Sequence, residues 1–219
     1  MFGRWYGPYA LQRISRRAEV RLRGRRLLTD PEVLHPIHFL STRVLVDAVR
    51  GLNLSGQRFL DMGSGSGAIA VFAAAQGARV TACDINPSAV ALTQENLKRN
   101  QLGAEVLASD LFSALSDRVF DLICFNIPYY DGEPRTPFDA ALFGGKDLVT
   151  VRRFADGCRR ALAPGGQVII LFSEDANGEM ILSHFRHAGL EVVDDRISSR
   201  FFERFHVVRF RALTPPVAA

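Results

Sequence analysis

The chain has 219 residues, of which 47% are hydrophobic and 23% are charged, and its formal net charge is +4. This length suits one domain with a full hydrophobic core, or one domain with a short extension. No apolar run approaches the roughly 18 residues of a membrane-spanning helix, and arginines interrupt the stretch where a signal peptide has its apolar region. We therefore expect a cytoplasmic protein without a membrane segment.

The cysteines and histidines indicate neither disulfides nor a metal. Cys83, Cys124 and Cys158 form no even framework and no CxxC pair, so we expect buried, reduced thiols in the cytoplasm. Four of the five histidines form two pairs with a spacing of three residues, His35/His38 and His184/His187, but no set of cysteines or carboxylates completes a site around either pair. No metal is predicted.

Positive charge is concentrated at the N-terminus. Residues 1–30 contain eight arginines and two acidic residues, which gives +6, whereas the rest of the chain sums to −2. We predict that residues 1–29 form a basic extension, with a short hairpin around Gly24. The charge suggests an anionic partner such as RNA or a ribosomal surface. A solvated, arginine-rich hairpin explains it equally well.

Hydrophobic periodicity and turn residues predict alternating strands and helices along the chain. In chain order we expect a hairpin over 18–29, a helix over 41–51 capped by Ser41, strand 59–61, helix 68–75, strand 79–84, helix 87–100, strand 105–108, strand 119–125, a long functional loop over 130–146, helix 147–162, strand 167–172, helix 178–188, strand 191–196 and strand 202–211. Such alternation typically builds a mostly parallel sheet.

The segment from Arg58 to Asn86 is the most informative part of the chain. It contains a strand, a glycine turn, a helix and a second strand, with Asp61 and Asp84 at the two strand ends. Glycines in the turn allow positive φ and let a ligand approach the backbone closely. An acid at the end of the second strand lies where it can accept hydrogen bonds from both ribose hydroxyls. This unit predicts a site for an adenosine-type cofactor. The turn residues concerned are Gly63, Ser64, Gly65 and Gly67.

Two alternatives remain open for this segment alone. Gly63, Gly65 and Ala68 also fit the dinucleotide-binding pattern GxGxxA, which is typical of nicotinamide dehydrogenases. A glycine-rich turn without any ligand is the simplest interpretation. Residues further along the chain must therefore decide between these interpretations of the glycine turn.

The second motif, Asn126-Ile127-Pro128-Tyr129, directly follows the nearly all-apolar strand 119–125. With the glycine turn, in this order and spacing, it resembles the class I S-adenosylmethionine-dependent methyltransferases of the amino-nitrogen branch. That branch carries (Asn/Asp/Ser)-x-Pro-(Tyr/Phe/Trp) at this point, and it includes release-factor glutamine methyltransferases and adenine methyltransferases of DNA and RNA. The resemblance covers roughly residues 30–212.

The resemblance implies an α/β fold for residues 30–212. We expect a Rossmann-like, seven-stranded, mostly parallel sheet with helices on both faces and an antiparallel last strand. The remaining tail, 213–219, is expected to be disordered.

The resemblance also implies how the second motif acts. A carboxamide or an adenine amine is a poor nucleophile because its nitrogen lone pair is delocalised. The side-chain oxygen of Asn126 and the backbone carbonyl of Ile127 are expected to accept hydrogen bonds from its two N–H groups. Pro128 stiffens the turn, and the ring of Tyr129 stacks on the flat target group.

For the methyl donor S-adenosylmethionine, the resemblance implies one role for each matching position. Asp61 lies near the methionine amino group, and Gly63 and Gly65 lie beneath the methionine chain, with Ser64 and Gly67 completing the turn. Asp84 binds the ribose, Ile85 packs on the adenine, Asp110 accepts from the adenine amine, and Leu111 covers the other adenine face. Thr42 reaches the donor from the N-terminal side, and Asn126 of the second motif is also expected to contact the donor.

The resemblance identifies the methyl acceptor less closely than it identifies the methyl donor. Residues 141–147 resemble a segment of glutamine methyltransferases, which slightly favours a protein glutamine, with a release factor or ribosomal protein as partner. Against this, Ile127 replaces a usual proline, Leu148 replaces a usual glycine, and the helical domain that binds the release factor has no counterpart in residues 1–29. The alternatives are the exocyclic amine of adenine in RNA or DNA, a small molecule, and a non-catalytic module that only binds the donor.

Overall fold

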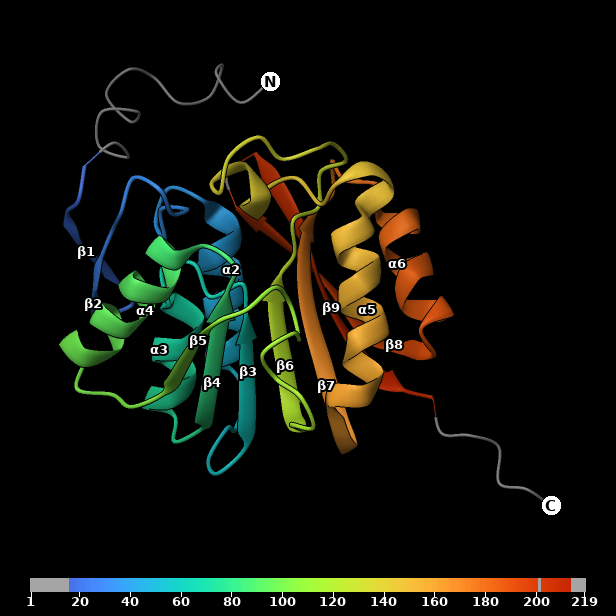
Figure 1. Ribbon diagram of the computed structural model, residues 1–219, viewed down its shortest axis with the longest axis horizontal. Helices are drawn as coiled ribbons and strands as arrows, with labels where there is room; N and C mark the ends of the chain where they lie inside the picture. Colours follow the sequence, from blue (N-terminus) through green and yellow to red (C-terminus); the bar gives the residue numbers. More distant parts are fainter. Residues whose placement is uncertain (1–15, 201, 214–219) are drawn as a thin grey trace.

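A seven-stranded sheet runs through the centre of the computed structural model, which describes residues 16–200 and 202–213 (Figure 1). In spatial order its strands are β5 (Glu105–Ala108), β4 (Arg79–Asp84), β3 (Arg58–Met62), β6 (Phe120–Asn126), β7 (Leu162–Ser173), β9 (Glu203–Ala212) and β8 (Leu190–Arg200). The five strands from β5 to β7 pair in parallel, and β9 runs antiparallel to both of its neighbours. The predicted Rossmann-like sheet with an antiparallel last strand is therefore confirmed. Residues 1–15 and 214–219, including most of the predicted tail, lie outside the described residues.

Helices cover both faces of the sheet (Figure 1). One face carries α2 (Leu40–Arg50), α3 (Ala68–Ala75) and α4 (Pro87–Arg99), and the other carries α5 (Val149–Ala161) and α6 (Gly178–His187). In β6, Ile123 and Phe125 join the apolar cluster under α5 and α6, whereas Leu122 and Cys124 join the cluster under α2 and α3. Successive strand residues point to opposite faces, so a strand covered on both sides must be almost wholly apolar.

The predicted hairpin is formed by β1 (Glu19–Leu22) and β2 (Arg25–Leu28). Arg23 and Gly24 make the two-residue turn, both with positive φ, which matches the twist of a tight hairpin. Leu22 and Leu27 are buried in the same apolar cluster as α2. The hairpin thus contributes to the core, and the domain boundary after residue 29 stays a prediction.

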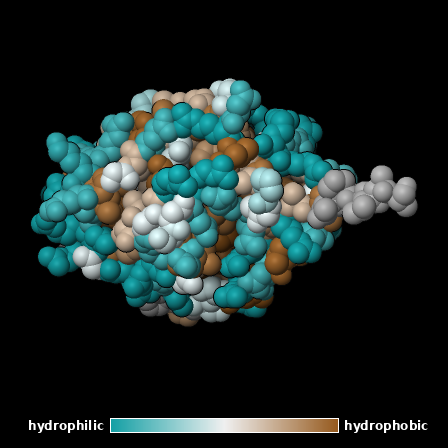
Figure 2. All heavy atoms as spheres, turned by 90° about the horizontal axis from the view of Figure 1, so that it is seen from below, coloured by the Kyte–Doolittle hydropathy of each residue, from teal (hydrophilic) through white to brown (hydrophobic). Residues whose placement is uncertain are grey.

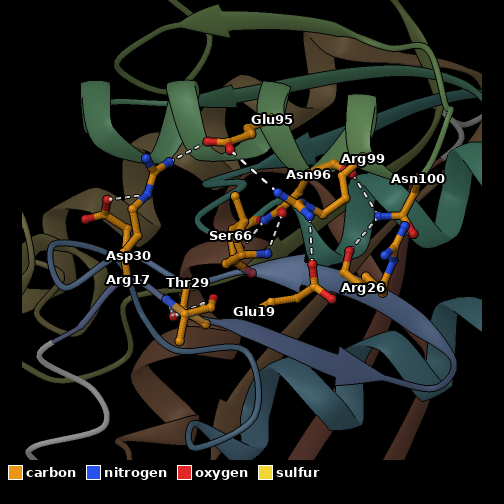
Figure 3. A network of polar contacts seen from close by, with 12 residues as sticks. Arg17, Glu19, Arg26, Thr29, Asp30, Ser66, Glu95, Asn96, Arg99 and Asn100 are labelled. Carbon is orange, nitrogen blue, oxygen red and sulfur yellow. Dashed lines mark hydrogen bonds and ion pairs between the residues drawn. The ribbon is translucent and has the colours of Figure 1, made fainter.

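Polar contacts attach the hairpin to α4 (Figure 3). The buried Asn96 accepts a hydrogen bond from the Leu28 amide at 2.6 Å and donates to the Leu28 carbonyl at 3.0 Å. The same Asn96 amide donates to the Ser66 carbonyl at 2.9 Å. A single side chain therefore connects the hairpin to the glycine turn after β3.

Several details of the prediction were wrong. Strand β8 continues to Arg200, beyond the predicted end at 196, and α5 begins at Val149 rather than at 147. Ser41 does not cap α2: Phe39 holds the cap position without a side-chain hydrogen bond, and Ser41 is buried within the first turn. Strand β7 begins at Leu162 rather than Gln167, because Leu162 pairs with Phe120 and a register shift accommodates the Pro-Gly-Gly segment that follows.

The cysteines Cys83, Cys124 and Cys158 are buried free thiols, as predicted. Within residues 16–200 and 202–213, no helix is both long and apolar enough to traverse a bilayer. Figure 2 shows the molecule from below, where the chain enters the parallel strands; hydrophilic residues cover most of this face and apolar residues lie in separate small areas. The cavity described next lies at the opposite, carboxyl ends of these strands.

Candidate functional site

A cavity of about 260 Å³ opens at the carboxyl ends of β3, β4 and β6. In sheets of this topology, ligands bind at this edge because loops diverge there. The structure brings eleven of the predicted site residues together in its wall. They are Thr42, Asp61, Gly63, Ser64, Gly65, Asp84, Ile85, Asp110, Leu111, Asn126 and Pro128.

The three glycines of the turn have different reasons to be glycine. All have positive φ, but a Cβ on Gly63 would lie 2.5 Å from the Phe125 ring, and one on Gly67 would lie 2.9 Å from the Thr93 backbone. Gly67 does not line the cavity; it begins α3 against α4. Only at Gly65 is the nearest atom, on Val33, as far as 3.8 Å from the Cβ position. Packing thus requires glycine at two positions, and the third leaves room in the cavity wall.

Two carboxylates stand at the strand ends on either side of the turn. Asp61 is almost fully buried and accepts a hydrogen bond from the Ala70 amide at 2.9 Å. Burial, and secondarily the charge of Asp84, raise the pKa of Asp61 to about 8 against the lowering effect of that amide. The Asp61 carboxyl is therefore largely protonated near neutral pH. A cation bound beside it would favour the charged form, and the carboxyl would then lose its proton.

Asp84 shapes the turn directly. Its two carboxylate oxygens accept hydrogen bonds from the Gly65 amide at 2.8 Å and the Asn86 amide at 2.9 Å. Burial raises the pKa of Asp84, while these amides act in the lowering direction. Next to it, Ile85 exposes 59% of its side chain at the cavity although it is strongly apolar. A carboxylate and an exposed apolar surface thus adjoin each other.

Asp110 lies in the cavity wall after β5 with a partner that the sequence did not suggest. Arg153 of α5 donates to its carboxylate at 2.7 Å, and both residues line the cavity. Leu111 follows with a positive φ of 49°, and its carbonyl accepts from the Ser109 hydroxyl at 2.7 Å. The Asp110 carboxylate is therefore shared with an arginine before any ligand arrives.

The orientation of the Asn126 amide is fixed from α2. Its nitrogen donates to the Ser41 hydroxyl at 3.2 Å. Its oxygen, Oδ1, is buried and has no hydrogen-bond partner within the described part of the chain. A buried acceptor without a donor costs about 1–3 kcal/mol, so this oxygen is available to an N–H group of a ligand. From the sequence, Ser41 was expected only to cap the helix, and its contact with Asn126 was not predicted.

The other residues of the second motif lie differently. Pro128 lines the cavity, but Ile127 is 1% exposed and its side chain belongs to the apolar cluster under α5. Tyr129 does not line the cavity; its ring meets Tyr130 edge-on at 4.8 Å between centroids. The side chain of Ile127 is thus part of the core, and the role expected of this residue depends on its backbone carbonyl alone.

The long loop after β6 forms one wall of the cavity, as the sequence suggested. It folds back on itself through Tyr130, whose amide donates to Leu142 at 3.0 Å and whose carbonyl accepts from Gly144 at 2.9 Å. A Cβ on Gly144 would lie 2.5 Å from the Pro128 carbonyl. This glycine therefore lets the loop lie directly on the motif. Its cavity-lining residues are Pro134, Pro137, Ala140, Ala141 and Phe143.

Acidic side chains surround the outer side of this loop. Burial, and then the charges of Asp175 and Glu203, raise the pKa of Tyr130. Burial and Asp175 also raise the pKa of Glu203. Asp131 and Glu133 accept hydrogen bonds from backbone amides of residues 147 and 146. We call Asp131, Glu133, Asp175 and Glu203 the acidic rim.

Comparison with known proteins assigns this site to a family. A family model described as "Methyltransferase small domain" matches residues 39–195. The chain belongs to the methyltransferase small-domain family. This methyltransferase is 32% identical over 200 residues to a protein of Methanocaldococcus jannaschii named "Putative protein N5-glutamine methyltransferase", covering 86% of this chain and 96% of that protein.

Two further comparisons place the methyltransferase among its relatives. It is 35% identical over 184 residues to the release factor glutamine methyltransferase of Salmonella typhimurium, covering 77% of this chain but 64% of that protein. In three dimensions it matches the 16S rRNA N2 G1207 methyltransferase of T. thermophilus, solved with AdoMet and guanosine, with a TM-score of 0.67 at 21% identity. That match covers 90% of this chain and 50% of the other, and it shows the common fold.

The enzyme is an S-adenosylmethionine-dependent methyltransferase. The donor set of the cavity fits this cofactor. A buried carboxylate at Asp61 suits an ammonium group, the Asp84 carboxylate suits a ribose diol, and the exposed Ile85 suits a flat ring. When bound, S-adenosylmethionine supplies an electrophilic methyl group.

Proposed function

We propose that this methyltransferase modifies a planar amino or amide nitrogen, with the side-chain amide of a protein glutamine as the favoured acceptor. The observation that carries the proposal is the buried, unpartnered Oδ1 of Asn126. Because Ser41 holds the amide nitrogen, the oxygen has a fixed position in the cavity wall. A planar NH₂ group has two N–H donors, and such a donor satisfies an acceptor that the fold leaves open.

In this proposal the motif positions the nitrogen rather than attacking anything. Asn126 Oδ1 accepts one N–H, and the backbone carbonyl of Ile127 accepts the other. Holding both N–H groups favours a pyramidal nitrogen with an available lone pair. Placement of this kind corresponds to effective molarities worth up to about 7–11 kcal/mol of barrier. No nucleophilic side chain is needed.

The remaining residues are proposed to hold the donor. Asp61 binds the methionine ammonium, Asp84 the ribose, and Ile85 one face of the adenine. Asp110 accepts from the adenine amine while it keeps its ion pair with Arg153, because a carboxylate has enough lone pairs for both. Gly63, Ser64 and Gly65 form the floor, with Thr42 and Leu111 on the sides.

The acidic rim supports a protein acceptor over a nucleic acid. The charges of Asp175 and Glu203 help to raise the pKa of Tyr130, and phosphates brought close to this part of the loop would meet the same charges. Like charges at close range in a partly buried place are unfavourable. A neutral or basic peptide meets no such repulsion. The glutamine methyltransferases of M. jannaschii and S. typhimurium, to which the chain is 32% and 35% identical, support the same choice.

The alternative acceptor is the exocyclic amine of adenine in RNA or DNA, which Asn126 would hold in the same way. The structural relative from T. thermophilus acts on rRNA, according to its description. A non-catalytic, donor-binding module is the alternative of another class. It would need no unpartnered acceptor at Asn126, so the orphan oxygen argues against it.

The deciding experiment uses labelled S-adenosylmethionine with three acceptors: a glutamine-containing release factor, total rRNA and duplex DNA. We expect label in the protein, identified as N-methylglutamine by mass spectrometry of peptides. Asn126→Ala should lower turnover by about 10²–10³, by analogy with loss of one preorganised polar contact. Donor affinity from calorimetry should change little. Label confined to rRNA or DNA would replace glutamine by adenine as the acceptor, and unchanged turnover in Asn126→Ala would remove the proposed site.

A further inference from the structure

Among the described residues, the arginines of the N-terminal segment differ in whether they form ion pairs. Residues 1–30 contain eight arginines and no lysine. Arg17 and Arg23 form ion pairs, with Glu95 and with Asp47, both at 2.5 Å. Within the described residues, Arg21 and Arg26 have no carboxylate within ion-pair distance. Only some arginines of the hairpin region therefore form ion pairs within the fold.

Arg21 and Arg26 lie directly opposite each other on the two strands of the hairpin. Both are exposed. Side chains at directly paired positions of antiparallel strands are about 4.5–5.5 Å apart at Cβ, and like charges there are destabilising. The neighbouring pair, Val20 and Leu27, points the other way, because Leu27 is fully buried. The hairpin thus presents two adjacent, uncompensated guanidinium groups to solvent.

We propose that this arginine pair, Arg21 and Arg26, is a binding surface for the phosphate backbone of RNA. A guanidinium offers a planar fork of donors that matches phosphate oxygens, and arginine is preferred to lysine where such matching matters. A phosphate between two opposed arginines removes the repulsion between them.

The fold holds this surface in a fixed orientation. Asn100, at the C-cap of α4, donates to the Arg26 carbonyl at 2.8 Å, and Arg99 of α4 pairs with Glu19 at 2.7 Å (Figure 3). With the two Asn96 bonds to Leu28, both strands are attached to α4. A rigid hairpin loses little conformational entropy on binding, so its charge is used efficiently.

Other anionic partners fit less well. A membrane surface requires apolar residues that insert between headgroups, and within residues 16–29 no large apolar side chain is strongly exposed. The acidic rim repels a polyanion, but it belongs to the loop after β6 and to the region of β7 and β9, not to the hairpin. RNA on the hairpin is therefore compatible with a peptide at Asn126. The inference does not depend on which acceptor is methylated.

The test measures binding of a short, fluorescein-labelled, single-stranded RNA by anisotropy at salt concentrations between about 50 and 200 mM. Each phosphate contact to a single strand contributes about 0.7 to the slope of log K against log salt, so Arg21→Ala/Arg26→Ala should lower the slope by about 1.4. Over this fourfold salt range, affinity of the wild type should therefore fall about 7-fold more than affinity of the variant. Arg152→Ala/Arg160→Ala is the matched control, because it removes two exposed arginines of α5 that likewise have no carboxylate partner among the described residues.

Equal slopes for the wild type and the Arg21/Arg26 variant, or an equal fall in the control, would overturn the proposal. So would displacement of the RNA by polyglutamate at the same charge concentration, because that result indicates a site for acidic peptides. Thermal unfolding shows whether the variants are folded. Asn126→Ala should bind RNA like the wild type, which separates this inference from the proposed reaction.

Discussion

The Ser41 hydroxyl oxygen and the Asn126 amide nitrogen lie 3.2 Å apart, although 85 positions separate the two residues in the chain. One end of the Asn126 amide is thereby attached to α2, and the other end, Oδ1, is left buried without a partner. A freely rotating amide would present its NH₂ group to the acceptor nitrogen half of the time, which is the wrong polarity. In the observed arrangement the contact from α2 occupies the nitrogen and leaves the acceptor end without a partner.

Replacement of Ser41 by alanine should therefore lower turnover while leaving donor binding intact. A single neutral hydrogen bond is worth about 0.5–1.5 kcal/mol, so kcat should fall about 2- to 10-fold. The donor dissociation constant from calorimetry should stay within error. Ser41→Thr keeps the hydroxyl and should recover most of the lost rate. If the threonine variant is as slow as the alanine variant and equally destabilised, Ser41 acts by packing alone.

Binding of the donor should release a proton from Asp61. The pKa of this buried carboxyl is about 8 in the free protein, so at pH 7 it is largely protonated, and an ammonium beside it favours the charged form. Donor affinity should consequently rise between about pH 6 and pH 8. Calorimetry at pH 7 in buffers of different ionisation enthalpy measures the released proton. Asp61→Asn should abolish this release, and equal enthalpies for the wild type in all buffers would refute it.

Asp84 should matter for donor affinity through two effects. Its carboxylate orders the glycine turn through the Gly65 and Asn86 amides, and it is proposed to bind the ribose. Loss of hydrogen bonds to a charged group costs about 1.5–3 kcal/mol, so Asp84→Ala should weaken donor binding about 10- to 150-fold. The affinity of adenosine, measured by competition with the donor, tests the ribose contact. If Asp84 binds the ribose, Asp84→Ala should weaken the binding of adenosine as well as that of the donor. Unchanged adenosine affinity would leave only the turn.

Acid should destabilise the protein through His35. This buried ring accepts hydrogen bonds from the amides of Ile37 and His38 just before α2. Burial, and then the charge of His38, lower the pKa of His35 from 6.5 to about 4. The unfolded chain binds the proton more readily, so this stability is present above about pH 6.5 and is lost as the pH falls towards about 4.

Urea unfolding at several pH values checks the His35 prediction. The free energy of unfolding of the wild type should fall between about pH 6.5 and pH 4, and His35→Gln should flatten that part of the curve. Asp61 has the opposite sign, because its raised pKa makes the folded state bind more protons between about pH 4 and pH 8. The comparison should therefore be repeated on an Asp61→Asn background. If His35→Gln leaves the slope of the unfolding free energy against pH unaltered on that background, His35 is not the source of the acid destabilisation.

The sequence by itself determined the chain order of strands and helices and eleven of the residues that line the cavity, and the resemblance to methyltransferases implied the seven-stranded sheet. Periodicity decides the strands and helices locally, because a strand that is apolar throughout, such as β6, must be covered on both faces. The same holds for Asp61 and Asp84, since residues at the ends of parallel strands meet at one edge whatever the details of packing. Helix α3 was found from the sequence with its observed ends, because small residues follow directly after the glycine turn.

Only the tertiary structure decided which polar groups meet. Ser41 and Asn126, Asp110 and Arg153, and Leu28 and Asn96 are each joined across dozens of residues, and no local spacing encodes such contacts. It also gave a reason for Leu148, which stands where relatives are expected to have glycine. Leu148 has a left-handed φ of 53°, which disfavours any side chain. Its side chain is 1% exposed in the cluster under α5, and burial of a leucine is worth about 1.5–3 kcal/mol, enough to offset that strain.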